Sequence, residues 1–272
     1  MNQPPAFVKK NERHAVLTQH GKRLRLIVGY DIVLDQPAGF PDEEVGMTMD
    51  LSFPDFSEAL KTYFMGDKRA ALEELTRLAA EHPDNASVFI LLGNVHYSLG
   101  VLDEALLNYR KAVELGPEYG HALYKLGICS FRAGLLDEAR DAFSRNLGLH
   151  GQTHAMSWYW IGLIDFFLGR DDEALASFHR LKDLSPGSNF ANFFMAQLLI
   201  KHNRHQEALD LLGELLEQTP NFSEALYMQA QAFRGLFKNF DAVQCLRKAI
   251  EYAPDDKRIR MELETLIDVP SI

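Results

Sequence analysis

The segment SWYWIGLIDFFLG, residues 157–169, consists almost entirely of apolar and aromatic residues, and its only charged residue is Asp165. A helix that crosses a bilayer needs about 20 apolar residues, so this segment is too short to span a membrane. Its pattern predicts a helix that is apolar around its whole circumference. One apolar face packs against the rest of the chain, and the second face needs its own explanation.

The same order of apolar, small and polar positions returns at a fixed interval along the chain. Residues 88–118, VFILLGNVHYSLGVLDEALLNYRKAVELGPE, align with residues 122–152, ALYKLGICSFRAGLLDEARDAFSRNLGLHGQ, at an offset of 34 residues. Such internal periodicity predicts a stack of similar units. The matched positions include Gly93 with Gly127, Gly100 with Gly134, and Ala105 with Ala139.

This period and these residues resemble the tetratricopeptide repeat, whose 34-residue unit is a helix-turn-helix. Six units follow in one register: 52–85, 86–119, 120–154, 155–188, 189–222 and 223–256. Small residues at unit positions 8 and 20 let the two helices approach closely. A glycine after the first helix supplies a positive φ, and a proline ends the second helix. The third unit has one additional residue and Gly151 in place of the proline, and Asn203 replaces the turn glycine of the fifth.

The resemblance implies an all-α fold, a right-handed α-solenoid, and the residues before the first repeat predict a short β-leaning N-terminal arm. We expect three regions: an arm with a β-hairpin and an acidic linker over residues 1–51, six repeats over 52–256, and a capping helix over 257–272. The last segment is charged and amphipathic, as the end of a solenoid must be for solubility.

The predicted arm differs from the repeats in its pattern. HAVLTQHGKRLRLIVGYDIVL, residues 14–34, is rich in β-branched residues and alternates apolar with basic residues at 23–26, which predicts two or three short strands. DQPAGFPDEEVG, residues 35–46, has the composition of a linker. An isolated hairpin is marginally stable, so we expect the arm to cap the first repeat. The other interpretation is that it covers part of the groove described next.

In this family, the first helix of each unit lines a concave groove through unit positions 2, 5, 6, 9, 12 and 13, which helical spacing places on one face. Here these positions are strongly aromatic in the third to fifth units, while positions for packing are filled by other residues. An apolar surface of this size is typical of a binding site. The candidate partner-binding residues are Tyr124, Lys125, Phe131, Tyr159, Trp160, Leu163, Phe166, Phe167, Phe190, Phe193 and Phe194.

The predicted function is a non-catalytic scaffold or chaperone-like adaptor that binds an apolar peptide or helix of a partner protein in this groove. The alternative is a self-assembling repeat protein, a homo-oligomer, whose groove is filled by its own arm or by another protomer. Asp165 takes unit position 11, where a pairing with Arg132 or Lys125 between neighbouring repeats is the favoured interpretation.

Composition narrows these predictions further. The formal net charge of −10 disfavours a nucleic-acid partner. The two cysteines, Cys129 and Cys245, are far apart, which favours a reduced, cytoplasmic setting. The N-terminal residues lack the pattern of a secretory signal. The histidines lack the companions of a metal site, and nucleotide-binding and hydrolase motifs are absent, so we expect no metal, no cofactor and no enzymatic activity.

Overall fold

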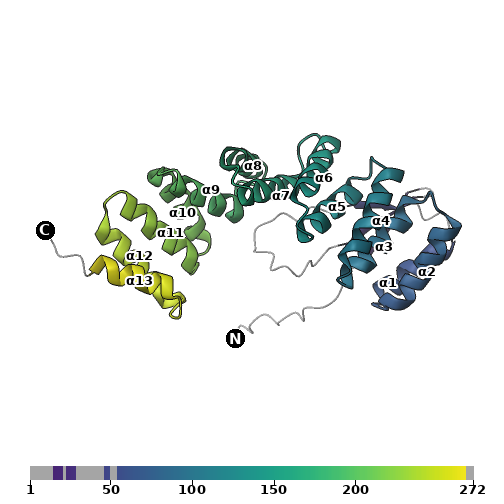
Figure 1. Ribbon diagram of the computed structural model, residues 1–272, viewed down its shortest axis with the longest axis horizontal. Coiled ribbons are helices and arrows are strands. Elements are labelled where there is room, and N and C mark those ends of the chain that lie inside the picture. The colour runs from purple at the N-terminus through teal and green to yellow at the C-terminus, as the bar shows by residue number, and fades with distance from the viewer. Residues whose placement is uncertain (1–14, 21–22, 29–45, 50–53, 268–272) are drawn as a thin grey trace, which may run out of the picture. The chain divides into compact units, whose positions relative to one another are not determined.

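The computed structural model describes residues 15–20, 23–28, 46–49 and 54–267. The chain forms two compact parts, Met1–Gln152 and Thr153–Ile272 (Figure 1). In both parts, helices of about the same length follow one another as antiparallel pairs. The N-terminal part contains α1 (Pro54–Phe64), α2 (Lys68–Glu81), α3 (Ala86–Ser98), α4 (Leu102–Leu115), α5 (Gly120–Arg132) and α6 (Leu136–Leu149). The C-terminal part contains α7 (Ala155–Phe167), α8 (Asp171–Leu184), α9 (Asn189–Lys201), α10 (His205–Gln218), α11 (Ser223–Gly235), α12 (Asn239–Tyr252) and α13 (Lys257–Ile267).

These helices confirm the predicted fold class. Each predicted repeat contains one helix pair, and α3, α5, α7, α9 and α11 begin within a residue of the expected unit starts. Packing divides the chain at one point only, after residue 152. The finer division of the whole chain into an arm, six repeats and a cap therefore stays a prediction.

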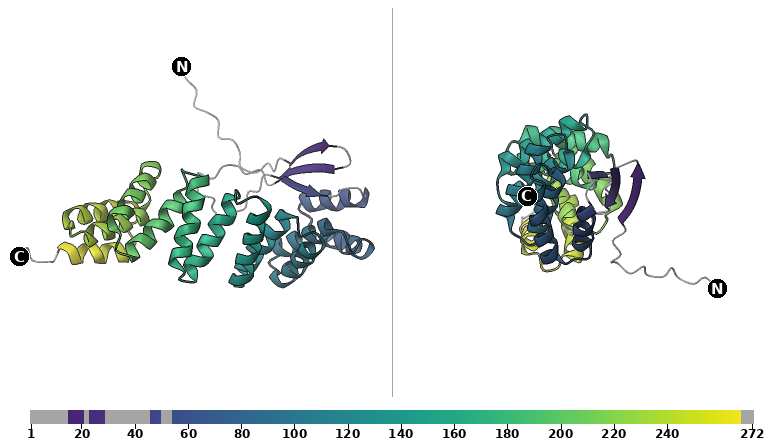
Figure 2. Two further views of the ribbon diagram at one scale, coloured as in Figure 1. Left: turned by 90° about the horizontal axis from the view of Figure 1, so that it is seen from above. Right: turned by 90° about the vertical axis from the view of Figure 1, so that its right-hand side faces the viewer.

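The predicted β-leaning arm contains a three-stranded antiparallel sheet with the order β1-β2-β3 (Figure 2). Its strands are β1 (Ala15–His20), β2 (Arg23–Val28) and β3 (Gly46–Met49). Ala15 pairs with Val28, and Leu24 pairs with Met49. Two or three strands were predicted within residues 14–34, but the third strand lies outside that segment and begins at Gly46, the last residue assigned to the linker. The rest of that linker, 35–45, lies outside the described residues, and so does the proposed docking of the arm.

A left-handed residue follows the first helix of each pair. It is glycine in the first four repeats, at Gly66, Gly100, Gly134 and Gly169, with φ between 71° and 86°. This agrees with the predicted role of the turn glycine, since glycine adopts positive φ without a steric penalty. Asn203 takes the position in the fifth repeat with φ 59°, and Phe237 takes it in the sixth with φ 60°. The phenylalanine was not anticipated.

Close packing of the two helices within a repeat depends on a matched pair of side chains. In the second, third and fourth repeats a glycine on the first helix faces a buried ring on the second: Gly93 with Tyr109, Gly127 with Phe143, and Gly162 with Phe178. A Cβ at Gly127 would come within 2.7 Å of the Phe143 ring. In the other three repeats, the same positions hold an alanine and a leucine, all buried: Ala59 with Leu75, Ala196 with Leu212, and Ala230 with Leu246. A larger residue on one helix is therefore compensated by a smaller one on the other.

This compensation predicts strong coupling between Gly127 and Phe143. Gly127→Ala should lower the free energy of unfolding by roughly 1–2 kcal/mol, because crowding of the Phe143 ring outweighs the higher helix propensity of alanine. The Gly127→Ala/Phe143→Leu variant recreates the alanine–leucine pair of other repeats, so its loss should be clearly smaller than the sum of the two single losses. Urea denaturation of the four proteins measures the coupling.

Gly148→Ala is the matched control, because no atom lies within 4 Å of a Cβ built there. This variant should be neutral or stabilised by up to about 1 kcal/mol. Additive losses in the double variant would contradict the compensation between the paired positions.

Candidate functional site: an aromatic face on α7 and α9

An aromatic face lies on two successive first helices, α7 and α9, in the C-terminal part. It is defined by Tyr159, Trp160, Phe166 and Phe167 of α7 and Phe190, Phe193 and Phe194 of α9. The rings contact each other in edge-to-face or tilted geometry. Tyr159 lies 5.2 Å from Phe190, and Phe166 lies 5.4 Å from Phe194, centroid to centroid. Such pairs each contribute about 0.5–1.5 kcal/mol beyond the area they bury. The structure thus brings together all seven aromatic candidates of the fourth and fifth repeats.

Part of this face is also repeat packing. Phe194 stacks at 5.2 Å and 8° on Phe178, which is completely buried on α8. Trp160 and Leu163 are buried as well. Half-buried members are Tyr159, Phe166, Phe190, Phe193 and Phe194, whereas 61% of Phe167 is exposed. The accessible edge of the face therefore runs from Phe167 to the half-buried rings, and its interior stabilises the contact between repeats.

Phe222 extends the aromatic face, and sequence reasoning missed it. This residue is the N-cap of α11 and stacks on Phe193 at 5.5 Å. It lies between helices, outside the positions that the helical periodicity assigns to a groove. The available signal was a large apolar residue at a connection that is otherwise polar.

The tyrosine in the aromatic face remains neutral. Burial raises the pKa of the Tyr159 phenol above its ordinary value. Because the group is uncharged at neutral pH, the face offers rings and apolar side chains with no charge of its own.

The other candidate residues, Tyr124, Lys125 and Phe131, lie on α5 in the N-terminal part. Tyr124 is buried and meets the Phe143 ring edge-to-face at 5.6 Å. Lys125 is half-buried, and burial lowers its pKa to about 8. Burial, with a contribution from the Lys125 charge, lowers the pKa of His121 to about 3. The surroundings of Lys125 and His121 on α5 therefore disfavour a positive charge.

Asp165 is completely buried in the last turn of the apolar helix α7, and a guanidinium nitrogen of Arg170 lies 3.5 Å from its carboxylate. A buried carboxylate needs such a partner to offset its desolvation. The pair spans the turn between α7 and α8, so it supports a structural role for this residue.

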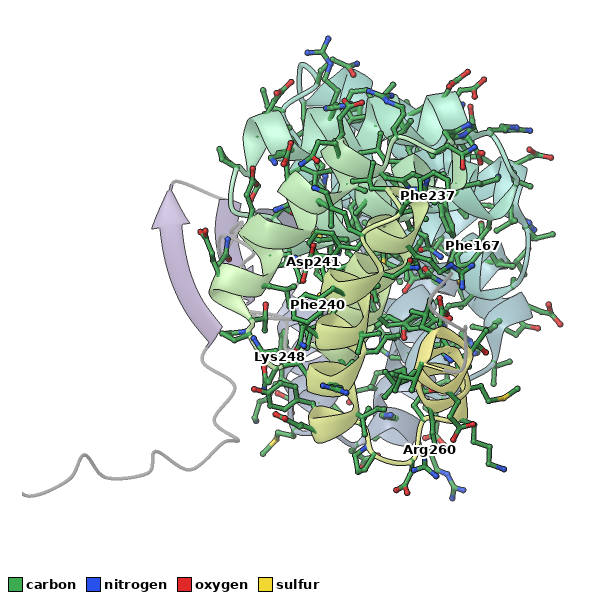
Figure 3. The ribbon with its side chains drawn as sticks, turned by 90° about the vertical axis from the view of Figure 1, so that its left-hand side faces the viewer. Phe167, Phe237, Phe240, Asp241, Lys248 and Arg260 are labelled. Atoms are coloured by element: carbon green, nitrogen blue, oxygen red, sulfur yellow. The ribbon has the colours of Figure 1, made fainter. Side chains whose placement is uncertain are left out.

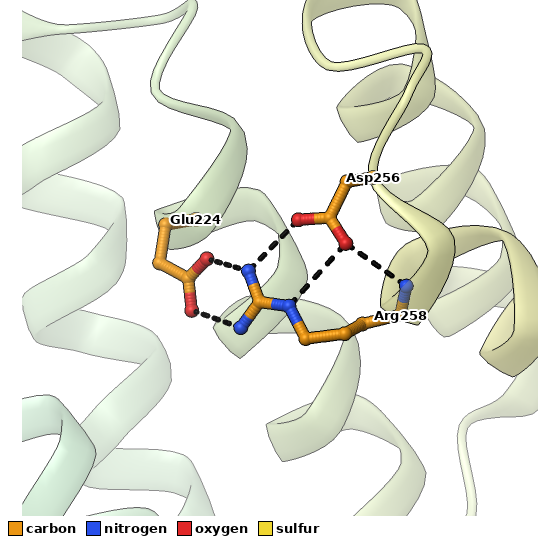
Figure 4. Close-up of polar contacts among 3 residues, drawn as sticks. All are labelled: Glu224, Asp256 and Arg258. Carbon is orange, nitrogen blue, oxygen red and sulfur yellow. Dashed lines mark hydrogen bonds and ion pairs between the residues drawn. The ribbon is translucent and has the colours of Figure 1, made fainter.

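In the last repeat, α11 carries charges that are paired with residues at the start of and along α13 (Figure 4). The guanidinium of Arg258, at the start of α13, donates to Glu224 of α11 at 2.8 Å and to Asp256 at 2.8 Å. It also lies over the Tyr227 ring, 5.4 Å from its centroid. Arg234 of α11 donates to Glu262 of α13 at 2.7 Å. These contacts attach α13 to α11 and give this end of the C-terminal part a polar surface.

Two general features of the described residues bear on the kind of site. None of the helices in that portion of the chain is both long and apolar enough to cross a membrane. Among the same residues, histidine, cysteine, aspartate and glutamate side chains form no group of three that could hold a metal ion.

Sequence comparisons assign the family. Profiles of the tetratricopeptide repeat match residues 56–118, 90–152, 168–232 and 224–256. The chain therefore belongs to the tetratricopeptide repeat family. This fold supports a role as a protein-interaction scaffold or adaptor, and proteins of this kind are generally non-catalytic.

Particular relatives share parts of the chain. The Protein SGT1 homolog of Bos taurus is 33% identical over 98 residues, which are 36% of this chain and 28% of that protein. Anaphase-promoting complex subunit 3 of Schizosaccharomyces pombe is 24% identical over 168 residues, 62% of this chain and 25% of that protein. The chain thus spans about a quarter of the length of the curated relatives it matches.

Solved structures show the same fold. YrrB, described as a TPR protein with an unusual peptide-binding site, is 26% identical with a TM-score of 0.63, covering 72% of this chain and all of YrrB. The pilus biogenesis factor PilW is 16% identical with a TM-score of 0.60, covering 77% of this chain and 96% of PilW.

The lowered pKa of His121 predicts an acid-sensitive fold. Between pH 6.5 and the folded pKa of about 3, the unfolded chain binds a proton at this histidine that the folded chain does not. The neutral His121 side chain therefore does not lower the free energy of unfolding above pH 6.5. Below that pH, proton binding to the unfolded chain lowers the free energy of unfolding by up to about 1.4 kcal/mol for each pH unit.

His121→Asn should reduce the decline in the free energy of unfolding between pH 6.5 and pH 5, measured by denaturation at each pH. Carboxylates titrate mostly at lower pH, so they contribute little in this range. The exposed His179→Asn variant is the control and should keep the decline of the original protein. An unchanged decline in His121→Asn would contradict the assigned cause.

Proposed function

We propose that this protein is a non-catalytic scaffold or adaptor that holds an apolar peptide or helix of a partner protein against the aromatic face of α7 and α9. The observation that carries the proposal is the network of seven rings on two adjacent helices, with Phe167 largely exposed and five rings half-buried. Aromatic residues at a partly desolvated surface supply most of the energy in many protein interfaces.

The neighbouring surfaces support this assignment by contrast. α11 and α13 pair their charges with one another through Arg258 and Arg234. An apolar segment would gain contacts with the rings on α7 and α9. On α11 and α13 it would instead meet charged side chains that are already paired with one another. Peptide binding described for the structural relative YrrB is consistent with this use of the fold. We expect the protein to act in the cytoplasm, where its free thiols, Cys129 and Cys245, stay reduced.

Binding of an apolar peptide should be visible in the intrinsic fluorescence. The chain has two tryptophans, Trp158 and Trp160, and both belong to α7. A synthetic helical peptide with leucines on one face should give a saturable change, and an isomer with the same composition but scattered leucines should not. Phe167→Glu/Phe190→Ser should weaken binding at least about tenfold, since it places a charge and a polar group on the face.

The matched control is Leu107→Glu on α4, because Leu107 is exposed to the same extent as Phe167, 62% against 61%. This variant should bind the peptide as tightly as the original protein does. Equal binding by the Phe167→Glu/Phe190→Ser variant would contradict the site. Failure of the full chain to bind any apolar helix would favour a face already occupied by its own arm or by another protomer.

A further inference from the structure

A histidine caps α7, the helix that carries most of the aromatic face. His154 is the N-cap residue, and the backbone N–H of Ser157 donates to its imidazole Nδ1 at 3.1 Å. The Ser157 hydroxyl lies 2.9 Å from the same nitrogen. A backbone N–H can only donate, so Nδ1 acts as an acceptor and the proton of the neutral ring is on Nε2. The cap therefore exists only while the imidazole is uncharged.

Elsewhere among the described first helices, side-chain caps come from residues that do not titrate. Asn85 accepts from the N–H of Ser87 at the start of α3, and Ser188 accepts from the N–H of Ala191 at the start of α9. Asparagine and serine are preferred N-cap residues, whereas a positive charge at a helix N-terminus opposes the helix dipole. Helix stability alone therefore favours asparagine or serine at position 154.

The connection before α7 also differs from the other connections between repeats. It has one additional residue and Gly151 in place of the proline, whose fixed φ restricts the backbone of the others. Gly151 and Gln152 both have left-handed backbone, with φ of 58° and 68°. With no proline to restrict this connection, the start of α7 depends more strongly on the cap that His154 provides.

Loss of the cap would act directly on the aromatic face. Tyr159 follows in the next turn, and its ring lies 5.2 Å from Phe190 of α9, centroid to centroid. The first turn of α7 holds the backbone of Tyr159, because each helical N–H bonds to the carbonyl four residues earlier. Phe167, the exposed ring of the face, is the last residue of the same helix (Figure 3). Fraying at the start of α7 therefore disturbs a ring that joins the two helices.

Other ionisable groups near the cap lie at the end of α8, which is antiparallel to α7, and in the preceding connection: Arg180, Lys182, Asp183 and His150. Arg180 lies 3.8 Å from Asp183. Lys182 lies 2.7 Å from Glu214. Nδ1 of His150 lies 2.8 Å from the carbonyl oxygen of Asn146. Residues 189–195 at the start of α9 include no ionisable side chain. The charges on α8 are thus already offset, and a proton on His154 would add positive charge where the dipole of α7 opposes it.

We propose that His154 makes the aromatic face sensitive to acid: a proton on its imidazole removes the cap of α7 and weakens the binding of an apolar peptide. Histidine side chains ordinarily gain a proton near pH 6.5, so the change falls between about pH 7.5 and pH 5. The cap contributes fully above this range and is lost as the pH falls through it, because its hydrogen bond needs the neutral ring. This inference rests on the proposed function, but the cap itself can be measured in the free protein.

Amide hydrogen exchange in the free, full-length protein reports the cap directly. Between pH 7.5 and pH 5, the protection factor of the Ser157 amide should fall roughly two- to thirtyfold, the range expected for loss of an N-cap. His154→Asn provides a cap that does not titrate, so its protection factor should be the same at both pH values. His154→Ala has no cap and should show the low protection at both.

Two further variants serve as controls. His179→Asn, on the exposed side of α8, should lose protection at Ser157 as the original protein does. Asn85→His places a titrating cap on α3, so it should make the amide of Ser87 sensitive to acid in the same way.

Peptide affinity connects the cap to the aromatic face. The probe is a helical peptide of leucine, alanine and glutamine, which has no ionisable side chain. Lowering the pH from 7.5 to 5 should weaken its binding to the original protein by a factor similar to the loss of protection. The affinity of His154→Asn for the peptide should not change.

Three results would overturn the proposal: constant protection of Ser157 in the original protein, protection that falls while the affinity stays constant, or an acid-induced loss of affinity that persists in His154→Asn. Absence of peptide binding at both pH values would contradict the proposed function and its coupling to the cap. The exchange data, which do not involve the peptide, would still decide whether the cap is lost in acid.

Discussion

The approach of two helices within a repeat is limited by the volume of one pair of side chains, and the surfaces of the protein depend on that limit. Where the first helix has glycine, the second presents a complete ring, as with Gly162 and Phe178. Where it has alanine, a leucine is sufficient, as with Ala196 and Leu212. The paired residues occupy fixed positions of the first helix, and other positions of α7 and α9 carry further aromatic residues. Phe194 connects the aromatic face to the packing within the repeats, because it belongs to that face and stacks on Phe178.

Most of the fold could be predicted because the repeat is encoded locally. Small residues at fixed spacing, turn glycines and helix-ending prolines recur every 34 residues, and observed helices begin at or next to the expected positions. Periodicity is less informative for the site. A helix that is apolar all round, such as α7, gives the same pattern for a ring buried between repeats and for one that faces solvent. Trp160 and Phe167 therefore could not be separated in advance, although one is buried and the other largely exposed.

Features that break the repeat were the ones missed. Phe222 lies between helices, β3 begins at the last residue of the predicted linker, and Phe237 occupies a turn position where glycine is expected. In the C-terminal part, the surface is divided between aromatic rings on α7 and α9 and paired charges on α11 and α13.

The most direct test of the aromatic face is methyl NMR of the full-length protein, labelled at isoleucine and leucine, during titration with an apolar helical peptide. Leu163 lies on α7, and Ile200 of α9 packs on the same apolar cluster as Phe193, so both report on the aromatic face, whereas Leu216 of α10 and Leu226 of α11 report on the neighbouring helices. The account predicts chemical-shift changes at Leu163 and Ile200 while Leu216 and Leu226 stay unchanged. Changes confined to Leu216 and Leu226, or no changes at any of the four, would contradict it.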